Sequence, residues 1–288
     1  MYDVLCYGAI SLDVSGLLKK HAQYGGQAEA IDYVLSPGGD AALVALTLSG
    51  LGWKAALAGG PVGADPLGDY LRGVLAGAGV DLYVESRGKT SIAAIAIDPS
   101  GSRSTLTYHE NTPFELIPVP GEAIGRSRFL YADGCYGPNS AAAGRAARTA
   151  GVPSALNLDS PAMEYTGLFD TVIASEGVSR LIAADPATAA EGICSRGAKL
   201  AIVTLGARGC VACDGGLTAV PAYRVSAVDT TGAGAAFAAG LVHAQLSGCS
   251  LAESLRIASA AGAYKCLVRG SYRRFSMEEL NIFLESAK

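Results

Sequence analysis

Short apolar segments alternate with helical segments along most of this 288-residue sequence. In the second half, runs typical of buried strands precede stretches with helical periodicity. The strands expected there are 129–132, 154–157, 171–174, 200–204 and 209–212. The expected helices are 140–150, 188–196, 235–246, 251–263 and 276–286. Because strands that alternate with helices form a mostly parallel sheet covered on both faces, we predict an α/β fold.

The first part of the sequence departs from this alternation at two places. Strands over 3–9, 54–58 and 81–85 and helices over 41–51 and 66–78 continue the pattern. Residues of about 14–36, which contain Gly25-Gly26, and the strands 92–97 and 105–108, joined by a turn at 99–102, indicate two hairpins instead. We expect one domain over residues 1–288, with a small β lid formed by about 14–36 and 88–110.

Composition excludes several classes of protein. Half of the residues are apolar and 17% are charged, which argues against disorder. The net charge of −4, without a basic stripe, gives no electrostatic reason to bind nucleic acid. The start of the sequence lacks the pattern of a signal peptide, and no apolar run reaches the ~18 residues of a membrane span. Seven cysteines do not indicate a disulfide framework, so we expect a cytoplasmic protein with neither membrane nor nucleic acid as a partner.

The segment 228–240, Val-Asp-Thr-Thr-Gly-Ala-Gly-Ala-Ala-Phe-Ala-Ala-Gly, carries the clearest chemical signal. Two glycines flank Ala233, where the backbone must turn tightly, and a helix of small residues follows at once. Free N–H groups and the helix dipole make such a helix start suitable for an anion. A short glycine-rich turn by itself also fits a purely structural connection between a strand and a helix.

The same segment resembles the signature of the ribokinase-like (PfkB) carbohydrate kinases, Asp-Thr-Thr-Gly-Ala-Gly-Asp-x-Phe. Every position matches except the second Asp, which is the catalytic base in the family and is Ala235 here. The resemblance implies a ribokinase-like three-layer fold with a mostly parallel central sheet, and ATP and Mg²⁺ as cofactors. It also implies phosphoryl transfer to a hydroxyl of a sugar or sugar-like molecule, with the N–H groups of Gly232, Ala233 and Gly234 stabilising the transferred group.

The alanine at position 235 predicts a chain that binds its reactants without joining them efficiently. A general base contributes about 10²–10⁴-fold to rate, and alanine cannot accept a proton. Either the alanine was introduced deliberately, or the protein is a natural pseudokinase that binds ligands. Asp229, Gly232, Gly234 and Phe237 all remain, and this selective loss of the base favours deliberate replacement.

Residues at two strand ends are candidates for the substrate site. Asp13 follows the first strand, at the edge where ligands bind to open α/β sheets. Asp40 opens the helix expected at 41–51 and also suits a simple helix cap. By resemblance, the substrate-binding residues are Asp13, Gly38, Gly39, Asp40, Arg103 and Asp229. Arg103 matches a Gly-x-Arg turn of the family, and its side chain either reaches the substrate from the lid or lies in solvent. Many family members have an asparagine four residues after the second glycine, and Leu43 occupies that position here.

The segment 203–209 resembles the nucleotide-binding Thr-x-Gly-x-x-Gly stretch of the family, although a plain hairpin turn is the other interpretation. The resemblance assigns the nucleotide to Thr204, Gly206, Gly209 and Thr231. Glu176 is a candidate for Mg²⁺, but the family's Asn-x-x-Glu is not present as such, since Ser175 and Val178 occupy its ends.

Three further expectations come from the resemblance. Family members often bind a monovalent cation such as K⁺ in a nearby loop. Asp229 and Thr231 match part of that loop, whereas Arg269-Gly270 aligns poorly with the rest of it. A homodimer through the lid is expected. A nucleoside kinase of the same fold is an alternative, which an aromatic pocket wall near Tyr108 and Tyr136 would favour.

Overall fold

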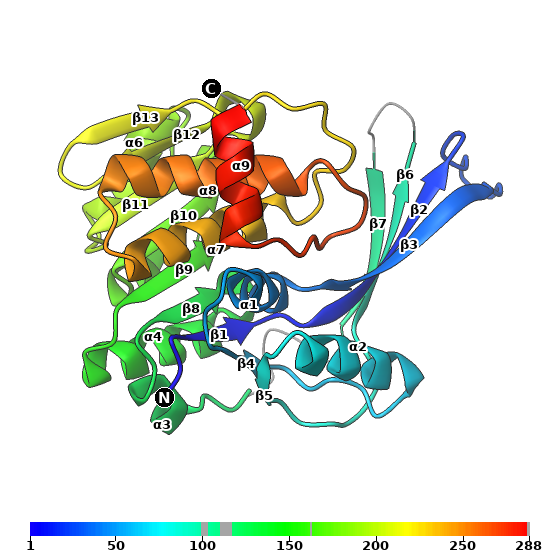
Figure 1. Ribbon diagram of the computed structural model, residues 1–288, viewed down its shortest axis with the longest axis horizontal. Helices are drawn as coiled ribbons and strands as arrows, with labels where there is room; N and C mark the ends of the chain where they lie inside the picture. Colours follow the sequence, from blue (N-terminus) through cyan, green and yellow to red (C-terminus); the bar gives the residue numbers. More distant parts are fainter. Residues whose placement is uncertain (99–102, 110–116, 162, 287–288) are drawn as a thin grey trace.

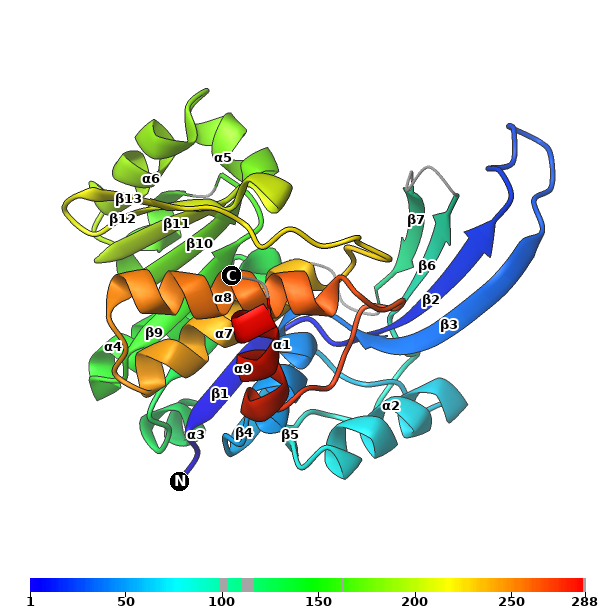
Figure 2. The same cartoon turned by 45° about the horizontal axis from the view of Figure 1, so that its top comes forward.

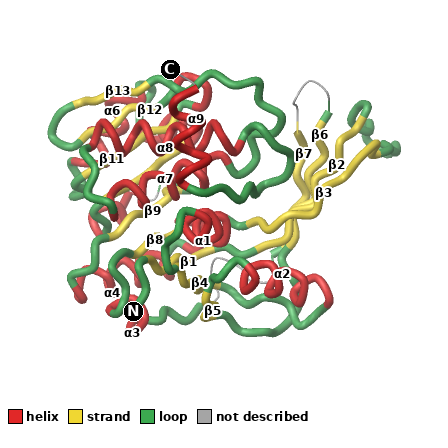
Figure 3. The backbone as a smooth tube through the Cα atoms, viewed as in Figure 1, coloured by secondary structure: helices red, strands yellow, loops and turns green. Residues whose placement is uncertain are grey.

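The computed structural model describes residues 1–98, 103–109, 117–161 and 163–286. These described residues form two β-sheets, one of nine strands and one of four. The larger sheet lies between helices, and the smaller one projects from this body as a separate set of strands (Figures 1 and 3). This architecture confirms the α/β fold with a small second sheet that was expected from the sequence.

The nine-stranded sheet is mostly parallel, as predicted. Only its last two pairings, β11–β12 and β12–β13, are antiparallel. In spatial order the strands are β13 (Leu217–Val220), β12 (Cys210–Cys213), β11 (Leu200–Thr204), β10 (Thr171–Ser175), β9 (Ser154–Leu158), β8 (Leu130–Asp133), β1 (Val4–Gly8), β4 (Ala55–Gly59) and β5 (Asp81–Tyr83). The sequence did not indicate β13, whose residues alternate between exposed and half-buried.

Helices cover both faces of this sheet. One face packs against α1 (Asp40–Gly50), α2 (Pro66–Gly77), α7 (Ala233–Leu246) and α8 (Leu251–Lys265), with α9 (Met277–Ser286) outside α8. The other packs against α3 (Gly121–Gly125), α4 (Pro138–Ala150), α5 (Glu176–Ile182) and α6 (Pro186–Cys194). Val4 and Cys6 of β1 join the first core, while Leu5 and Tyr7 join the second. Burial on both faces explains the continuous apolar runs in the sequence.

No helix among the described residues has the length and apolar character needed to cross a membrane.

The four-stranded sheet, called the lid below, has the spatial order β3 (Ala30–Gly38), β2 (Ser11–Leu18), β6 (Ile92–Ile97) and β7 (Arg103–Tyr108). Neighbouring strands place paired residues on the same face, and successive residues on opposite faces. One row joins Val34, Ser15, Ile95 and Thr105. The next row joins Leu35, Val14, Ala94 and Leu106.

The two faces of the lid differ in exposure. On the inner face, Ser15 and Ile95 are each only 5% exposed. On the outer face, Leu106 is 77% exposed and Tyr33 is 68% exposed. The observed strands overlap the predicted lid ranges 14–36 and 88–110, while the predicted turn at 99–102 lies outside the described residues.

Candidate active site

The predicted phosphate loop forms the N-terminus of α7. Gly232 caps this helix in the left-handed conformation, with φ of 78°, and no side chain caps it. A Cβ on Gly232 would lie 1.9 Å from the carbonyl oxygen of Ser271. Both the backbone angle and this close approach therefore require glycine at 232. Ala233 donates its N–H to the Thr230 carbonyl at 3.2 Å, and the next N–H groups begin the helix with its positive dipole end.

A cavity of about 380 Å³ lies between this loop and the lid. Ile95 and Thr105 line it from the inner face of the lid, and Thr230, Thr231, Gly232 and Gly234 line it from the loop. A Cβ on Gly234 would meet no atom within 4 Å, so the backbone at this position is open to a ligand. Arg103 begins β7, two residues before Thr105, rather than lying in a turn. The structure thus brings the lid and the predicted phosphate loop to one cavity.

Position 235 lies in the first turn of α7, next to this opening. Ala235 is 3% exposed and belongs to the core between α7 and the sheet. Its methyl group offers neither a donor nor an acceptor, so the side chain at this position cannot take a proton.

Asp13 is buried on the inner face of the lid and is 6% exposed. Its carboxylate accepts hydrogen bonds from the hydroxyls of Ser271 and Ser11. Burial raises the pKa of Asp13 and the nearby charge of Asp229 raises it further, while the two serine hydroxyls oppose the shift. A Cβ on Gly38 would lie 1.9 Å from Asp13 Oδ1, so glycine is what lets β3 pass beside this carboxylate.

Ser271 connects Asp13 to the phosphate loop. Its N–H donates to Ser36 Oγ at 3.0 Å, and its carbonyl touches Gly232. Figure 2 shows the segment between α8 and α9 reaching the base of the lid, which is where these contacts form. Two predicted groups of residues, far apart in the sequence, therefore meet through a serine that sequence reasoning did not identify.

Asp229 holds the loop in place through backbone contacts. Its carboxylate accepts the N–H groups of Thr231 at 2.8 Å and Gly270 at 3.0 Å, and its carbonyl accepts the ammonium of Lys265 at 3.0 Å. Both carboxylate oxygens are engaged in this way, so the geometry gives Asp229 a positioning role. Thr231 Oγ1 is buried and has no hydrogen-bond partner among the described residues.

Further carboxyl groups gather where β8 and β9 end. Asp40, the first residue of α1, accepts a hydrogen bond from the buried hydroxyl of Tyr131. Burial and the charge of Asp133 raise the pKa of Asp40 to about 7. Asp133 is 1% exposed, and burial with the charge of Asp159 raises its pKa to about 7 as well. Ligand atoms of Asp133, Cys135 and Asp159 lie within 4.8 Å of one another.

This acid cluster lies beside the predicted Gly-Gly-Asp segment. Gly39 has φ of 83°, and a Cβ on it would lie 2.4 Å from the Ala9 carbonyl. The Ala9 N–H donates to Asp133 at 3.1 Å, which ties this turn to the end of β8. Carboxyl groups of this kind accept hydrogen bonds from paired hydroxyls, and they titrate as a coupled set. Part of the cluster was detectable in principle, because Asp133 ends β8 and Asp159 follows β9 at the ligand-binding edge of the sheet.

The predicted nucleotide residues lie at the ends of β10 and β11. Thr204 pairs with Ser175 across the two strands and donates its hydroxyl to the Ala174 carbonyl at 3.4 Å. Gly206 has φ of 58° and open space around it, as a ligand-facing turn requires. A Cβ on Gly209, by contrast, would lie 2.0 Å from the Val220 carbonyl, so this glycine allows two strands to approach.

Glu176 is engaged by two arginines. Its carboxylate pairs with Arg208 at 2.7 Å and also with Arg180. These contacts, the Arg208 hydrogen bond first, hold the pKa of Glu176 below its usual range. A carboxylate neutralised by two arginines is a poor ligand for a divalent cation, so this arrangement does not fit Mg²⁺ on Glu176. The arginines instead add positive charge close to the predicted nucleotide segment.

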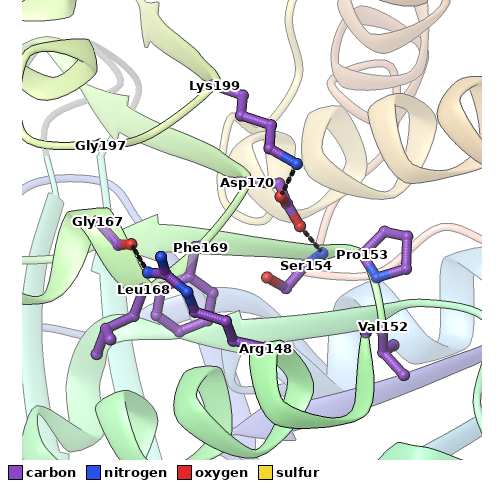
Figure 4. A pocket seen from close by; sticks show the side chains of 11 residues that line it. Arg148, Val152, Pro153, Ser154, Gly167, Leu168, Phe169, Asp170, Gly197 and Lys199 are labelled. Carbon is purple, nitrogen blue, oxygen red and sulfur yellow. Dashed lines mark hydrogen bonds and ion pairs between the residues drawn. The ribbon is translucent and has the colours of Figure 1, made fainter.

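A larger cavity, of about 500 Å³, lies at the opposite edge of the sheet, where β9 and β10 begin (Figure 4). Its polar groups already pair with one another. Asp170 accepts the N–H of Ser154 at 3.0 Å and pairs with Lys199 at 2.7 Å, while Arg148 donates to the Gly167 carbonyl at 2.8 Å. Ligands of open α/β sheets bind at the other edge, so we assign the site to the smaller cavity.

Comparison with known proteins identifies the family. The model of the pfkB family carbohydrate kinases matches residues 1–277. The chain belongs to the PfkB family. It is 32% identical over 278 residues to an ATP-dependent ribose-1-phosphate kinase of Halopiger xanaduensis, covering 91% of each chain. It is also 28% identical over 298 residues to Fructokinase-1 of rice, Oryza sativa subsp. japonica, covering 90% of this chain and 92% of the other.

Solved structures agree on the fold. A putative ribokinase from Agrobacterium tumefaciens superimposes with a TM-score of 0.89 at 22% identity, covering 99% of this chain and 98% of the other. A nucleoside kinase of Burkholderia thailandensis in complex with inosine gives a TM-score of 0.81 at 21% identity, covering 99% and 97%. PfkB membership identifies the protein with a family of carbohydrate kinases.

Proposed function

We propose that this PfkB protein binds ATP and a sugar or sugar-like molecule for phosphorylation of a hydroxyl, and that Ala235 leaves the transfer step impaired. The observation that carries the proposal is the cavity between the loop 230–234 and the inner face of the lid. The relatives named as a fructokinase and a ribose-1-phosphate kinase support a sugar-like acceptor.

The proposed roles follow from position. The N–H groups of the cap Gly232 and of Gly234 at the start of α7 bind the transferring phosphoryl group and stabilise its negative charge, whereas the Ala233 N–H holds the turn through the Thr230 carbonyl. Asp13, Gly38, Gly39 and Asp40 lie on the acceptor side, where their carboxylates accept hydroxyl hydrogen bonds. Arg103 on the lid remains a predicted substrate contact.

The remaining groups bind the nucleotide. Thr204, Gly206 and Thr231 contact its phosphates in the proposed complex, and Gly209 shapes the turn beside them. When bound, Mg²⁺ neutralises charge on the phosphates. Because Glu176 is paired with two arginines, we do not propose it as a ligand of that ion.

The acceptor class and the state of the enzyme each have an alternative. A nucleoside kinase requires a wall for the base, which Tyr108 and Tyr136 were expected to supply. Tyr108 shares its row of the lid with Ile92 and Leu12 on the outer face, and Tyr136 packs edge-on against Tyr7. This arrangement favours a sugar over a nucleoside. A natural pseudokinase that binds ligands is the remaining alternative.

The test is the replacement Ala235→Asp, followed by measurement of ADP formation with sugars, sugar phosphates and nucleosides as acceptors. We expect turnover with the variant and about 10²–10⁴-fold less with the parent chain, the range of a general base. Turnover with nucleosides alone would establish the first alternative. Tight ligand binding without turnover by the variant, on any acceptor, would establish the pseudokinase and contradict the proposed function.

The outer face of the lid supports the predicted homodimer. Ile31, Tyr33, Leu35, Leu106 and Tyr108 are 42–77% exposed on one side of the sheet. An exposed apolar surface of this kind is typical of a protein interface. We propose that two copies pair through this face. The predicted cytoplasmic location stays a prediction.

A further inference from the structure

Lys265 is buried in a way that lysine rarely is. It is the last residue of α8 and is 1% exposed. Lysine is almost never fully buried unless its ammonium has a partner, because a charge without one is costly away from water. Its Nζ donates to the Asp229 carbonyl at 3.0 Å. Burial lowers the pKa of Lys265, and the charge of Asp229 opposes that shift. None of the roles proposed above uses this ammonium.

The surroundings of Lys265 are rich in oxygen. The charge of the Asp229 carboxylate favours the ammonium, and the carbonyl of Cys266, the residue after Lys265, accepts the N–H of Val228 at 2.7 Å and that of Asp229 at 3.3 Å. The C-terminal end of α8 adds the negative end of a helix dipole. A carboxylate, carbonyls and a helix C-terminus together favour a positive charge at this junction.

We propose that Lys265 is a built-in cation, which takes the place of a monovalent metal ion beside the phosphate loop and makes nucleotide binding independent of K⁺. The PfkB resemblance implied a cation loop at Asp229 and Thr231. The residues here do not fit an added ion on the Asp229 carbonyl, because the ammonium already contacts that oxygen. The inference rests on the proposed nucleotide site at Gly232.

Lys265 acts on the nucleotide indirectly, as a positioning residue. It fixes Asp229, whose carboxylate holds the N–H of Thr231 immediately before the Gly232 cap of α7. It also lies at the end of the helix that leads to Gly270, the second N–H on Asp229. Loss of the ammonium therefore loosens the loop that presents its N–H groups to phosphate.

The experiment measures the Kd of Mg²⁺-ATP by calorimetry in KCl, NaCl and tetramethylammonium chloride at equal ionic strength. The parent chain is expected to give the same Kd in all three salts. Lys265→Met keeps the length of the side chain without its charge, and is expected to weaken ATP binding by about tenfold or more, as loss of a charged hydrogen-bond donor does. Lys265→Ala leaves space for an ion, so K⁺ but not tetramethylammonium is expected to restore affinity. Lys199→Met, at an exposed lysine, is the matched control and is expected to match the parent.

The outcomes separate this inference from the proposed function. A parent chain that binds ATP only in K⁺ overturns the built-in cation while the nucleotide site stands. A folded Lys265→Met with parental affinity in tetramethylammonium overturns it too. If the parent binds no ATP in any salt, the proposed function fails. The parent's thermal unfolding midpoint then still tests the cation: a K⁺-specific rise overturns the inference, and its absence supports it. If the Lys265 variants do not fold, the effect of K⁺ on the parent's thermal unfolding midpoint tests the built-in cation in the same way.

Discussion

Two glycines of the phosphate loop, two positions apart, should respond in opposite ways to the same replacement. In Gly232→Ala, the new methyl meets the Ser271 carbonyl at 1.9 Å while the backbone keeps φ at 78°. The left-handed conformation costs alanine about 1–2 kcal/mol relative to glycine. Relief of the clash moves Ser271, which carries hydrogen bonds to Ser36 and Asp13.

Loss of those two hydrogen bonds accounts for the rest of the expected destabilisation. A neutral hydrogen bond contributes about 1 kcal/mol and one to a charged group about 1.5–3 kcal/mol, so Gly232→Ala should destabilise the fold by roughly 3–6 kcal/mol in all. Gly234→Ala meets no atom within 4 Å and lies inside α7. There alanine is the better helix former, by up to about 1 kcal/mol. The methyl does enter the cavity, so ATP binding should weaken even though the fold does not.

Urea unfolding of the parent and both variants measures the free energy of unfolding, and calorimetry measures the Kd of Mg²⁺-ATP. We expect Gly232→Ala to be much less stable than the parent and Gly234→Ala to be at least as stable, with weaker ATP binding in both. Parental stability for Gly232→Ala would refute the geometry assigned to the helix start. Parental ATP affinity for a folded Gly234→Ala would show that the phosphate does not bind at this loop.

Other perturbations test the acceptor side, the acid cluster and the lid. Asp13→Asn should weaken acceptor binding at least about tenfold, with little change in ATP affinity, since a charged acceptor of hydroxyl hydrogen bonds is lost; calorimetry with both ligands checks this. The raised pKa of Asp133 means that its stabilising contribution is complete below the unfolded-state value of about 3.9 and is lost as pH rises through about 7. Asp159→Asn removes the neighbouring charge and should flatten the fall in unfolding free energy between pH 4 and pH 8, as measured by urea unfolding at each pH. An unchanged dependence of the unfolding free energy on pH would contradict the interaction between Asp133 and Asp159. Leu106→Asp should convert the proposed dimer to monomer in sedimentation, whereas Leu181→Asp, at another exposed leucine, should not; a dimer that survives Leu106→Asp contradicts the lid interface.

The sequence predicts the body of this fold because burial on both faces of the large sheet leaves apolar runs that local patterns reveal. The start of α7 was predictable for a similar local reason, since Gly232 is required by the backbone itself. β13 escaped prediction because its alternating, half-exposed residues lack an apolar run. Lys265 looks in the sequence like an ordinary basic residue at a helix end, and only packing shows that it is buried.

The candidate site could be proposed from the sequence in parts, but not as a whole. Asp13 and the phosphate loop were each proposed from their own neighbourhoods. The serine that joins them lies 258 positions from Asp13, a separation at which no local pattern operates. Such contacts depend on tertiary packing, and the distance between two motifs in space cannot be read from their spacing in the chain.

The bond between Ser271 and Asp13 also has a consequence for synthesis of the chain. It closes a loop of 258 positions, and the entropy of closing a loop must be met before its contacts stabilise anything. On the ribosome, β1, the lid and most of the sheet can form while residue 271 has yet to emerge. Until it does, Asp13 and the phosphate loop are unconnected, so a nascent chain completes the candidate site only after residue 271 has been synthesised.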